Sequence, residues 1–180
     1  MRVGWKTIKS QIVYHNPWFR VREDAVKRPD GKRGIYGIVE RPHVNFVIAQ
    51  IKNKILFINE YRYPIKKIIL QLPAGTTNVN EGDLHAAQRE LLQETGYRAK
   101  IWKKYGSFFI APGHESIQAN LFVASNCTEA KKRTTPSNEV INKIQLIPLT
   151  KIKKLIALNK IQCGISLACL NIFFQKNERP

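Results

Sequence analysis

Two glutamates, Glu90 and Glu94, are the residues whose type and spacing point most directly to chemistry. They lie within a stretch that predicts a helix over Asp83–Thr95, and residues four apart on a helix project from the same side. Two close anions beside an apolar face repel each other and lose hydration unless a cation neutralises them. Oxygen ligands favour a hard divalent ion, Mg²⁺ or Mn²⁺, which works with substrate phosphates. The alternative is a solvated helix edge that Arg89 neutralises.

The expected helix must hold this pair against a sheet. Leu84, Ala87 and Leu91 recur at helical spacing and predict one apolar stripe that packs on strands. Gly96 follows the last expected helical residue, where a helix end favours a residue that can become left-handed. His85 lies on the same helix with no second His or Cys at metal-ligand spacing, so we interpret it as an ordinary exposed residue.

The residues around the pair resemble the signature of the Nudix family. Gly75 is followed after five residues by Glu81 and, after seven more, by Arg89-Glu90-Leu91-x-Gln93-Glu94-x-Gly96-Tyr97. The family signature has a glycine and a glutamate at the same spacing, then Arg-Glu-apolar-x-Glu-Glu-x-Gly-apolar. One position departs from it, because Gln93 stands where a glutamate is expected.

The resemblance also implies roles for the motif residues. Glu81 and Arg89 are expected to tie the loop to the helix by an ion pair, and Gly75 and Gly82 to allow the turns of the loop. The family uses the backbone carbonyl before the first glycine as a metal ligand. The implied metal-binding set is therefore Ala74, Glu90, Gln93 and Glu94. An amide oxygen can coordinate a metal but carries no charge, so Gln93 predicts weaker metal binding and a weakened hydrolase.

The implied fold is an α/β/α sandwich with a mixed sheet and an N-terminal antiparallel β extension. We expect the extension over residues 1–40 and the Nudix hydrolase domain over 41–180. Asn16-Pro17-Trp18 and the turn Arg28-Pro29-Asp30-Gly31-Lys32 resemble the ADP-ribose pyrophosphatase branch, in which this sheet packs on a second subunit. The resemblance thus implies a homodimer. Trp18 either stacks on a nucleobase or belongs to the core.

Hydrophobic patterning predicts the remaining elements. Strands are expected at 18–22, 34–40, 44–51, 55–59, 68–72, 98–104 and 118–125, and helices at 150–158 and 166–175. Thr150 is the expected N-cap of the first of these helices.

Three further positions resemble substrate or catalytic residues of that branch. Arg62, before a proline, matches an arginine that holds the diphosphate, a role suited to the guanidinium fork; the alternative is a surface ion pair. The loop Ala111-Pro112-Gly113-His114-Glu115 matches a Pro-Gly loop that relatives follow with an acid or glutamine, where this chain has Ile117 between Glu115 and Gln118. Glu139 is the nearest match to the general base, two residues beyond the best-aligned Ser137; the alternative is an exposed loop residue. The catalytic candidates are Glu94, Glu115 and Glu139.

Composition sets the class of protein. The chain has 30 basic and 13 acidic residues and a net charge of +17, which attracts phosphate-rich substrates or RNA; the alternative is a compositional bias, because the lysines are scattered. No apolar run approaches the length of a membrane span, and the N-terminus carries no secretory pattern. Three cysteines without metal spacing indicate reduced thiols and a cytoplasmic protein.

The resemblance implies a Mg²⁺-dependent or Mn²⁺-dependent hydrolase that cleaves a nucleoside diphosphate linked to a second group. With ADP-ribose the products are AMP and ribose 5-phosphate; a nucleotide sugar is the other expected substrate. Two alternatives stay open. One is a Nudix enzyme acting on an RNA 5′ pyrophosphate or cap, and the other is a catalytically weak Nudix-fold protein that binds nucleotides.

Overall fold

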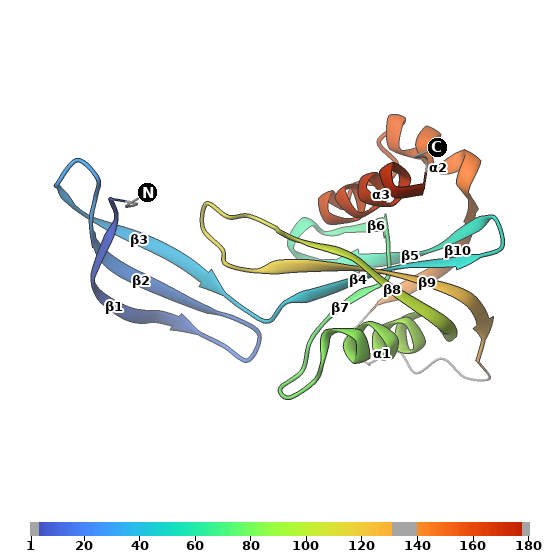
Figure 1. The fold of residues 1–180 in the computed structure, drawn as a ribbon, viewed down its shortest axis with the longest axis horizontal. Helices are drawn as coiled ribbons and strands as arrows, with labels where there is room; N and C mark the ends of the chain where they lie inside the picture. The colour runs from blue at the N-terminus through green and yellow to red at the C-terminus, as the bar shows by residue number, and fades with distance from the viewer. Residues whose placement is uncertain (1–3, 131–139, 178–180) are drawn as a thin grey trace. The chain divides into compact units, whose positions relative to one another are not determined.

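The computed structural model describes residues 4–130 and 140–177, which form two compact units. The first unit holds the described residues up to His43 together with Phe108–Gln118. Its antiparallel sheet has the order β1-β2-β3 (Figure 1), with β1 at Lys6–His15, β2 at Arg20–Lys27 and β3 at Arg33–Glu40. The expected turn joins β2 to β3, and Gly31 adopts a φ of 84° there, which a glycine reaches without strain.

This N-terminal sheet has little apolar interior of its own. Every residue of β1 is exposed, including Ile8 at 55%, Ile12 at 48% and Tyr14 at 52% of their surface. Trp18 is 71% exposed, which makes the core interpretation of this side chain wrong. A sheet that leaves so much apolar surface uncovered has the character of an interaction surface.

The second unit is built on a sheet whose main path has the order β10-β5-β4-β9-β8, with β6 on β5 and β7 on β4. β4 pairs parallel with β9 and antiparallel with β5 and β7, so the sheet is mixed. The strands are β4 (Val44–Ile51), β5 (Lys54–Arg62), β6 (Lys67–Gln71), β7 (Ala74–Thr76), β8 (Tyr97–Phe109), β9 (Gln118–Glu129) and β10 (Ile141–Pro148).

Helices cover both faces of this sheet. The helix α1 (Asp83–Thr95) lies on one face, and α2 (Leu149–Ala157) and α3 (Gly164–Asn177) lie on the other, with a 3₁₀ turn at Tyr63–Ile65 (Figure 1). The expected α/β/α sandwich is thereby confirmed. Because both faces are covered, the central strand β4 is buried at successive positions and shows no alternation. One core cluster contains Val47, Ala49, Leu56, Ile58, Ala87, Leu91, Phe122 and Ala124.

Helix ends agree with the sequence at one helix and differ at another. Gly96 ends α1 in the left-handed conformation, as expected, with a φ of 76°, and its N–H donates to the carbonyl of Leu92 at 2.8 Å. Leu84 is 39% exposed, so its place in the buried stripe was wrong. Thr150 is also not the cap of α2: Pro148 takes that position without a side-chain hydrogen bond, and Thr150 lies inside the helix.

All three cysteines are free thiols, and burial raises the pKa of Cys127 to about 11. Within residues 4–130 and 140–177, no helix has both the length and the apolar character needed to cross a membrane.

Candidate active site

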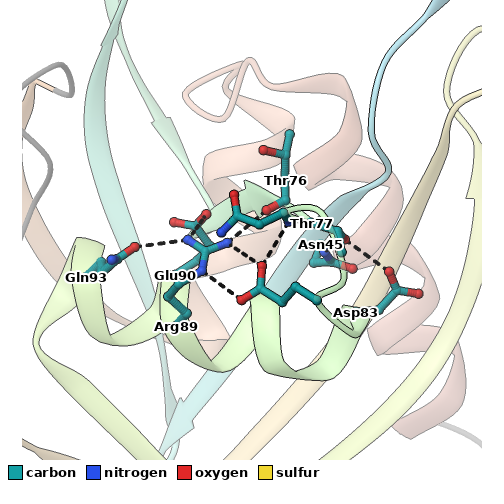
Figure 2. A network of polar contacts seen from close by, with 9 residues as sticks. Asn45, Thr76, Thr77, Asp83, Arg89, Glu90 and Gln93 are labelled. Atoms are coloured by element: carbon teal, nitrogen blue, oxygen red, sulfur yellow. Dashed lines mark hydrogen bonds and ion pairs between the residues drawn. The ribbon is translucent and has the colours of Figure 1, made fainter. Parts of the chain in front are cut away.

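Arg89, in the middle of α1, joins the loop before the helix to the helix itself (Figure 2). Its Nε and Nη2 donate to the two carboxylate oxygens of Glu81 at 2.9 and 3.0 Å, and Nη2 also donates to the carbonyl of Thr76 at 2.9 Å. Its Nη1 donates to Glu90 at 2.7 Å and to Gln93 at 3.1 Å. All five N–H groups of the guanidinium therefore have an acceptor in this one motif.

The Glu81–Arg89 pair confirms the expected ion pair between loop and helix. It is bidentate, the strongest arrangement of an arginine with a carboxylate. The hydrogen bonds from Arg89 hold the pKa of Glu81 below its ordinary value, although partial burial acts in the opposite direction. Hydrogen bonds to Glu81 in turn raise the pKa of Arg89. Glu81 also accepts from the backbone N–H of Asn78 at 2.9 Å, which fixes the loop at a second point.

Glu90 and Glu94 are both buried, with 6% and 2% of their surface exposed. The alternative interpretation, a solvated helix edge, is therefore wrong, because both side chains lie on the buried face beside Ala87 and Leu91. Glu94 accepts the backbone N–H of Ala74 at 3.0 Å, so the strand β7 that follows Pro73 is held to α1. Glu90 is charge-paired with Arg89. Two carboxylates are thus held in a partly dehydrated position next to one short strand.

Gly75 was expected to allow a turn of the loop, but its role in the structure is different. A Cβ on this residue would lie 2.0 Å from the carboxyl carbon and from Oε1 of Glu90, so only glycine leaves room for that carboxylate. The expectation that Gly75 permits a turn was therefore wrong: it lies within β7 and permits a close approach. At Gly82 an added Cβ would meet no described atom within 4 Å, so that position imposes no such demand.

The donor set of the candidate metal site is composed of oxygen atoms. Among the described residues, no three His, Cys, Asp or Glu side chains group together as a metal site. The candidate set has two carboxylates, Glu90 and Glu94, and the uncharged oxygens of Ala74 and Gln93. The burial of the Glu90 and Glu94 carboxylates and the hard character of these oxygen donors fit a divalent ion such as Mg²⁺ or Mn²⁺. Gln93 already uses one lone pair on Arg89.

A chain of polar side chains behind the motif was missed by the sequence analysis. Thr77 donates to Asp83 at 3.1 Å and accepts from Asn45 at 2.9 Å (Figure 2). Asn45 in turn accepts from Asn120 at 3.0 Å. Asn120 accepts from Ser107 at 2.7 Å. Asn45 is completely buried within the apolar run of β4, and a lone amide in such a run was the available signal.

Arg62 lies at the end of β5 in a second polar cluster. Its Nη1 is 2.9 Å from Glu60, its Nε donates to Gln71 at 3.2 Å, and Gln71 donates to Glu60 at 2.7 Å. Glu60 and Gln71 are buried, whereas 41% of the Arg62 side chain is exposed. The ion pair given as the alternative exists, and the contact with diphosphate stays a prediction.

The candidate bases lie apart from α1 in the chain. Glu115 belongs to the first unit, where it lines a hollow of about 440 Å³ with Arg22, Tyr36 and Glu40. Its Oε2 is buried, lies 3.6 Å from Arg41, and makes no hydrogen bond among the described residues. Glu139 and Ser137 lie outside the described residues. Gln118 begins β9, and Ile117 is 1% exposed.

Comparison with known proteins gives concordant matches. Residues 39–162 match the family model described as the NUDIX domain, and residues 5–39 match the nucleoside diphosphate sugar hydrolase N-terminal domain. The methanol dehydrogenase activator of Bacillus methanolicus is 32% identical over 146 residues, 81% of this chain and 78% of that protein. The ADP-ribose pyrophosphatase of Bacillus subtilis (strain 168) is 26% identical over 152 residues, 84% of this chain and 82% of that protein. A crystal structure of an ADP compounds hydrolase has the same fold, with a TM-score of 0.85 at 19% identity, covering 98% of this chain and 97% of that one.

Proposed function

The chain belongs to the Nudix hydrolase family, and from that premise we propose that it cleaves the diphosphate of ADP-ribose or of a nucleotide sugar. The observation that carries the proposal is the pair of buried carboxylates, Glu90 and Glu94, held beside Ala74 and Gly75 on β7. The match of the N-terminal strands to a nucleoside diphosphate sugar hydrolase domain supports the substrate class. With ADP-ribose, water would add to phosphorus and the P–O bond would break, giving AMP and ribose 5-phosphate.

Glu90, Glu94 and the carbonyl oxygen of Ala74 are the proposed ligands of Mg²⁺ or Mn²⁺, with the amide oxygen of Gln93 as an uncharged addition. A bound divalent ion offsets the charge of a diphosphate and lowers the pKa of an attacking water. Arg89 and the N–H of Ala74 hold the two carboxylates in place before any ligand binds. Such preorganisation reduces the entropy lost when the substrate is positioned.

Other residues are proposed to bind the substrate and move the proton. Arg62 has an exposed edge that could bind diphosphate oxygens, while Glu60 holds the rest of the guanidinium. Glu115 or Glu139 is proposed to accept the proton of the attacking water. Trp18 is exposed and offers an aromatic face for a nucleobase.

Assembly and location are also proposals. The exposed apolar residues of β1 support a homodimer formed through residues 1–40, with residues 41–180 as the hydrolase domain. The free thiols support a cytoplasmic location.

A second candidate is a Nudix-fold protein that binds nucleotides and turns them over slowly. The observation that favours it is Gln93, which removes one negative charge from the motif and whose oxygen accepts from Arg89. Such a protein would bind ADP-ribose whether or not Glu94 is intact, and would release AMP only slowly.

A product assay tests the proposed function. Purified protein is incubated with ADP-ribose, nucleotide sugars and 5′-triphosphate RNA, with and without Mg²⁺, and the products are resolved by mass. We expect AMP and ribose 5-phosphate only with the metal, and a loss of at least about 100-fold in Glu94→Gln, more than the loss of an outer-shell partner causes. Glu129→Gln, an exposed glutamate on β9, is the matched control.

Two results would contradict the proposal. Equal turnover by Glu94→Gln and wild type would show that Glu94 is not a ligand of a catalytic metal ion. Conversion of 5′-triphosphate RNA to its monophosphate, without hydrolysis of any ADP compound, would show that RNA is the substrate instead. The net charge of +17 suits the binding of RNA phosphates.

A further inference from the structure

A groove of about 470 Å³ lies between α1 and β8, on a side of the helix that the proposed hydrolysis does not use. Its helical wall is formed by His85, Gln88, Arg89 and Leu92. Its strand wall is formed by Arg98, Ala99 and Trp102. We propose that this groove is a second binding site, and that it takes a nucleoside monophosphate.

The groove is separate from the buried carboxylates. The residues of its helical wall recur at intervals of three and four, which puts them on one stripe of α1. The stripe that packs on the sheet contains Ala87, Glu90, Leu91 and Glu94 instead. Arg89 is common to both regions, but its guanidinium is fully bonded within the motif. It can therefore offer the groove only the carbon atoms of its side chain.

Arg98 supplies the positive charge for a phosphate. Its side chain is exposed, and among residues 4–130 and 140–177 it makes no ion pair. Lys104, further along β8, is by contrast 3.6 Å from Asp83 at the start of α1. That pair shows that β8 runs back along the helix, so the groove extends from the first turn of α1 to the strand's beginning. A guanidinium with open donors binds phosphate oxygens bidentately.

Trp102 supplies a flat surface for a base. Its Nε1 donates to the carbonyl of Ala99 at 3.2 Å, so the polar atom of the indole is satisfied within the strand. The ring is only partly buried, and Leu92 and Ala99 extend the apolar wall next to it. Base–aromatic stacking stabilises a bound nucleotide whatever its base. Gln88 adds an amide donor and acceptor for the edge of a ring.

These features select one ligand class. The volume falls in the range of small-molecule sites. A cation, a stacking surface and an amide together match a phosphate, a base and the polar edge of that base, whereas a sugar phosphate would leave the Trp102 surface uncovered. AMP is the probe of choice. The proposal stands on direct binding and does not require the chain to hydrolyse any substrate.

Tryptophan fluorescence gives a direct test. The chain has three tryptophans, and Trp5 and Trp18 are exposed, so Trp5→Phe with Trp18→Phe leaves Trp102 as the single reporter. AMP, adenosine and ribose 5-phosphate are titrated in EDTA, which removes metal-dependent binding at the carboxylates. We expect AMP to change the fluorescence saturably. Adenosine and ribose 5-phosphate, each lacking one half of the contacts, should bind at least about tenfold more weakly.

A matched pair of variants locates the site. Arg98→Gln should weaken AMP binding by about tenfold or more, and Lys100→Gln, which removes the same charge from an exposed position on the same strand, by less than about twofold. Thermal melting confirms that each variant folds. The proposal is overturned if AMP leaves the Trp102 signal unchanged and calorimetry detects no binding, or if both variants bind AMP equally. Neither measurement involves turnover, so a failure of the proposed hydrolase would be seen separately.

Discussion

Gly75 and Glu90 approach each other so closely that a single methyl group on Gly75 would lie 2.0 Å from the Glu90 carboxyl carbon. Fifteen positions separate the two residues in the sequence, and the contact joins β7 to α1. The carboxylate fills the space that a side chain would otherwise occupy. The geometry of the candidate metal site therefore depends on a residue that has no functional group.

Gly75→Ala is expected to displace the Glu90 carboxylate and to abolish most of the hydrolase activity. Overpacking at a buried contact costs about 1–3 kcal/mol of unfolding free energy. Urea denaturation and the ADP-ribose assay measure the two effects. Gly82→Ala is the control, because an added Cβ there meets no described atom within 4 Å. Full activity in Gly75→Ala would show that Glu90 can move without consequence.

The Glu81–Arg89 pair predicts a pH-dependent contribution to stability. Its hydrogen bonds hold the folded pKa of Glu81 below the unfolded value, so the folded state favours the charged form. The contribution is complete above the unfolded pKa, which is about 4.3, and is lost as the pH falls through the lower folded pKa. We expect the difference in unfolding free energy between wild type and Glu81→Gln to be largest at neutral pH and to shrink below about pH 4. Urea denaturation from pH 3 to pH 7 measures it, with Glu129→Gln as a reference. A difference that is constant over this range would exclude the linkage.

Gln93→Glu is expected to restore a negative charge to the motif and to raise hydrolysis several-fold at limiting Mg²⁺. The physical reason is that a carboxylate binds a hard cation more strongly than an amide does. The Mg²⁺ concentration at half-maximal rate should fall as well. Arg89 can still donate to the new carboxylate, so the fold should be retained. Unchanged rates at every Mg²⁺ concentration would show that residue 93 is not a ligand.

Ile12→Lys is expected to convert the proposed homodimer into a monomer, because a charge in an apolar interface loses hydration without compensation. Ile12 is 48% exposed in the isolated chain. Gln11→Lys introduces the same charge at the adjacent position, whose side chain points to the opposite face of the strand, and is expected to stay dimeric. Light scattering after size-exclusion chromatography gives the mass. A wild-type monomer at micromolar concentration would contradict the proposed assembly.

The parts of this molecule that were predictable from sequence are those with local causes. Helix α1 follows from its periodicity and from the glycine at its end, and its predicted bounds, Asp83–Thr95, are confirmed. Leu84 was wrongly predicted to be buried, because periodicity gives the direction of a side chain but not whether another element covers it. The match to the Nudix domain confirms the family interpretation that the motif spacing supported.

Contacts between distant parts of the sequence were not predictable in the same way. The demand for space at Gly75 comes from a carboxylate on another element. The hydrogen bond between Asn45 and Asn120 joins residues 75 positions apart, on two parallel strands. Sequence patterns identify Asn45 as unusual in an apolar run, but its partner is set by the register of β4 against β9.

One guanidinium ties the loop before α1 to a fixed position on the helix. Arg89 donates hydrogen bonds to Thr76 at the end of β7, to Glu81 in the loop, and to Glu90 and Gln93 in the helix. Each residue inserted into α1 before Arg89 would rotate Arg89 by about 100° around the helix axis and carry it away from Thr76 and Glu81, whereas Glu90 and Gln93 would rotate together with it. The intervals counted along the printed sequence are therefore a measure of how far a single side chain can reach.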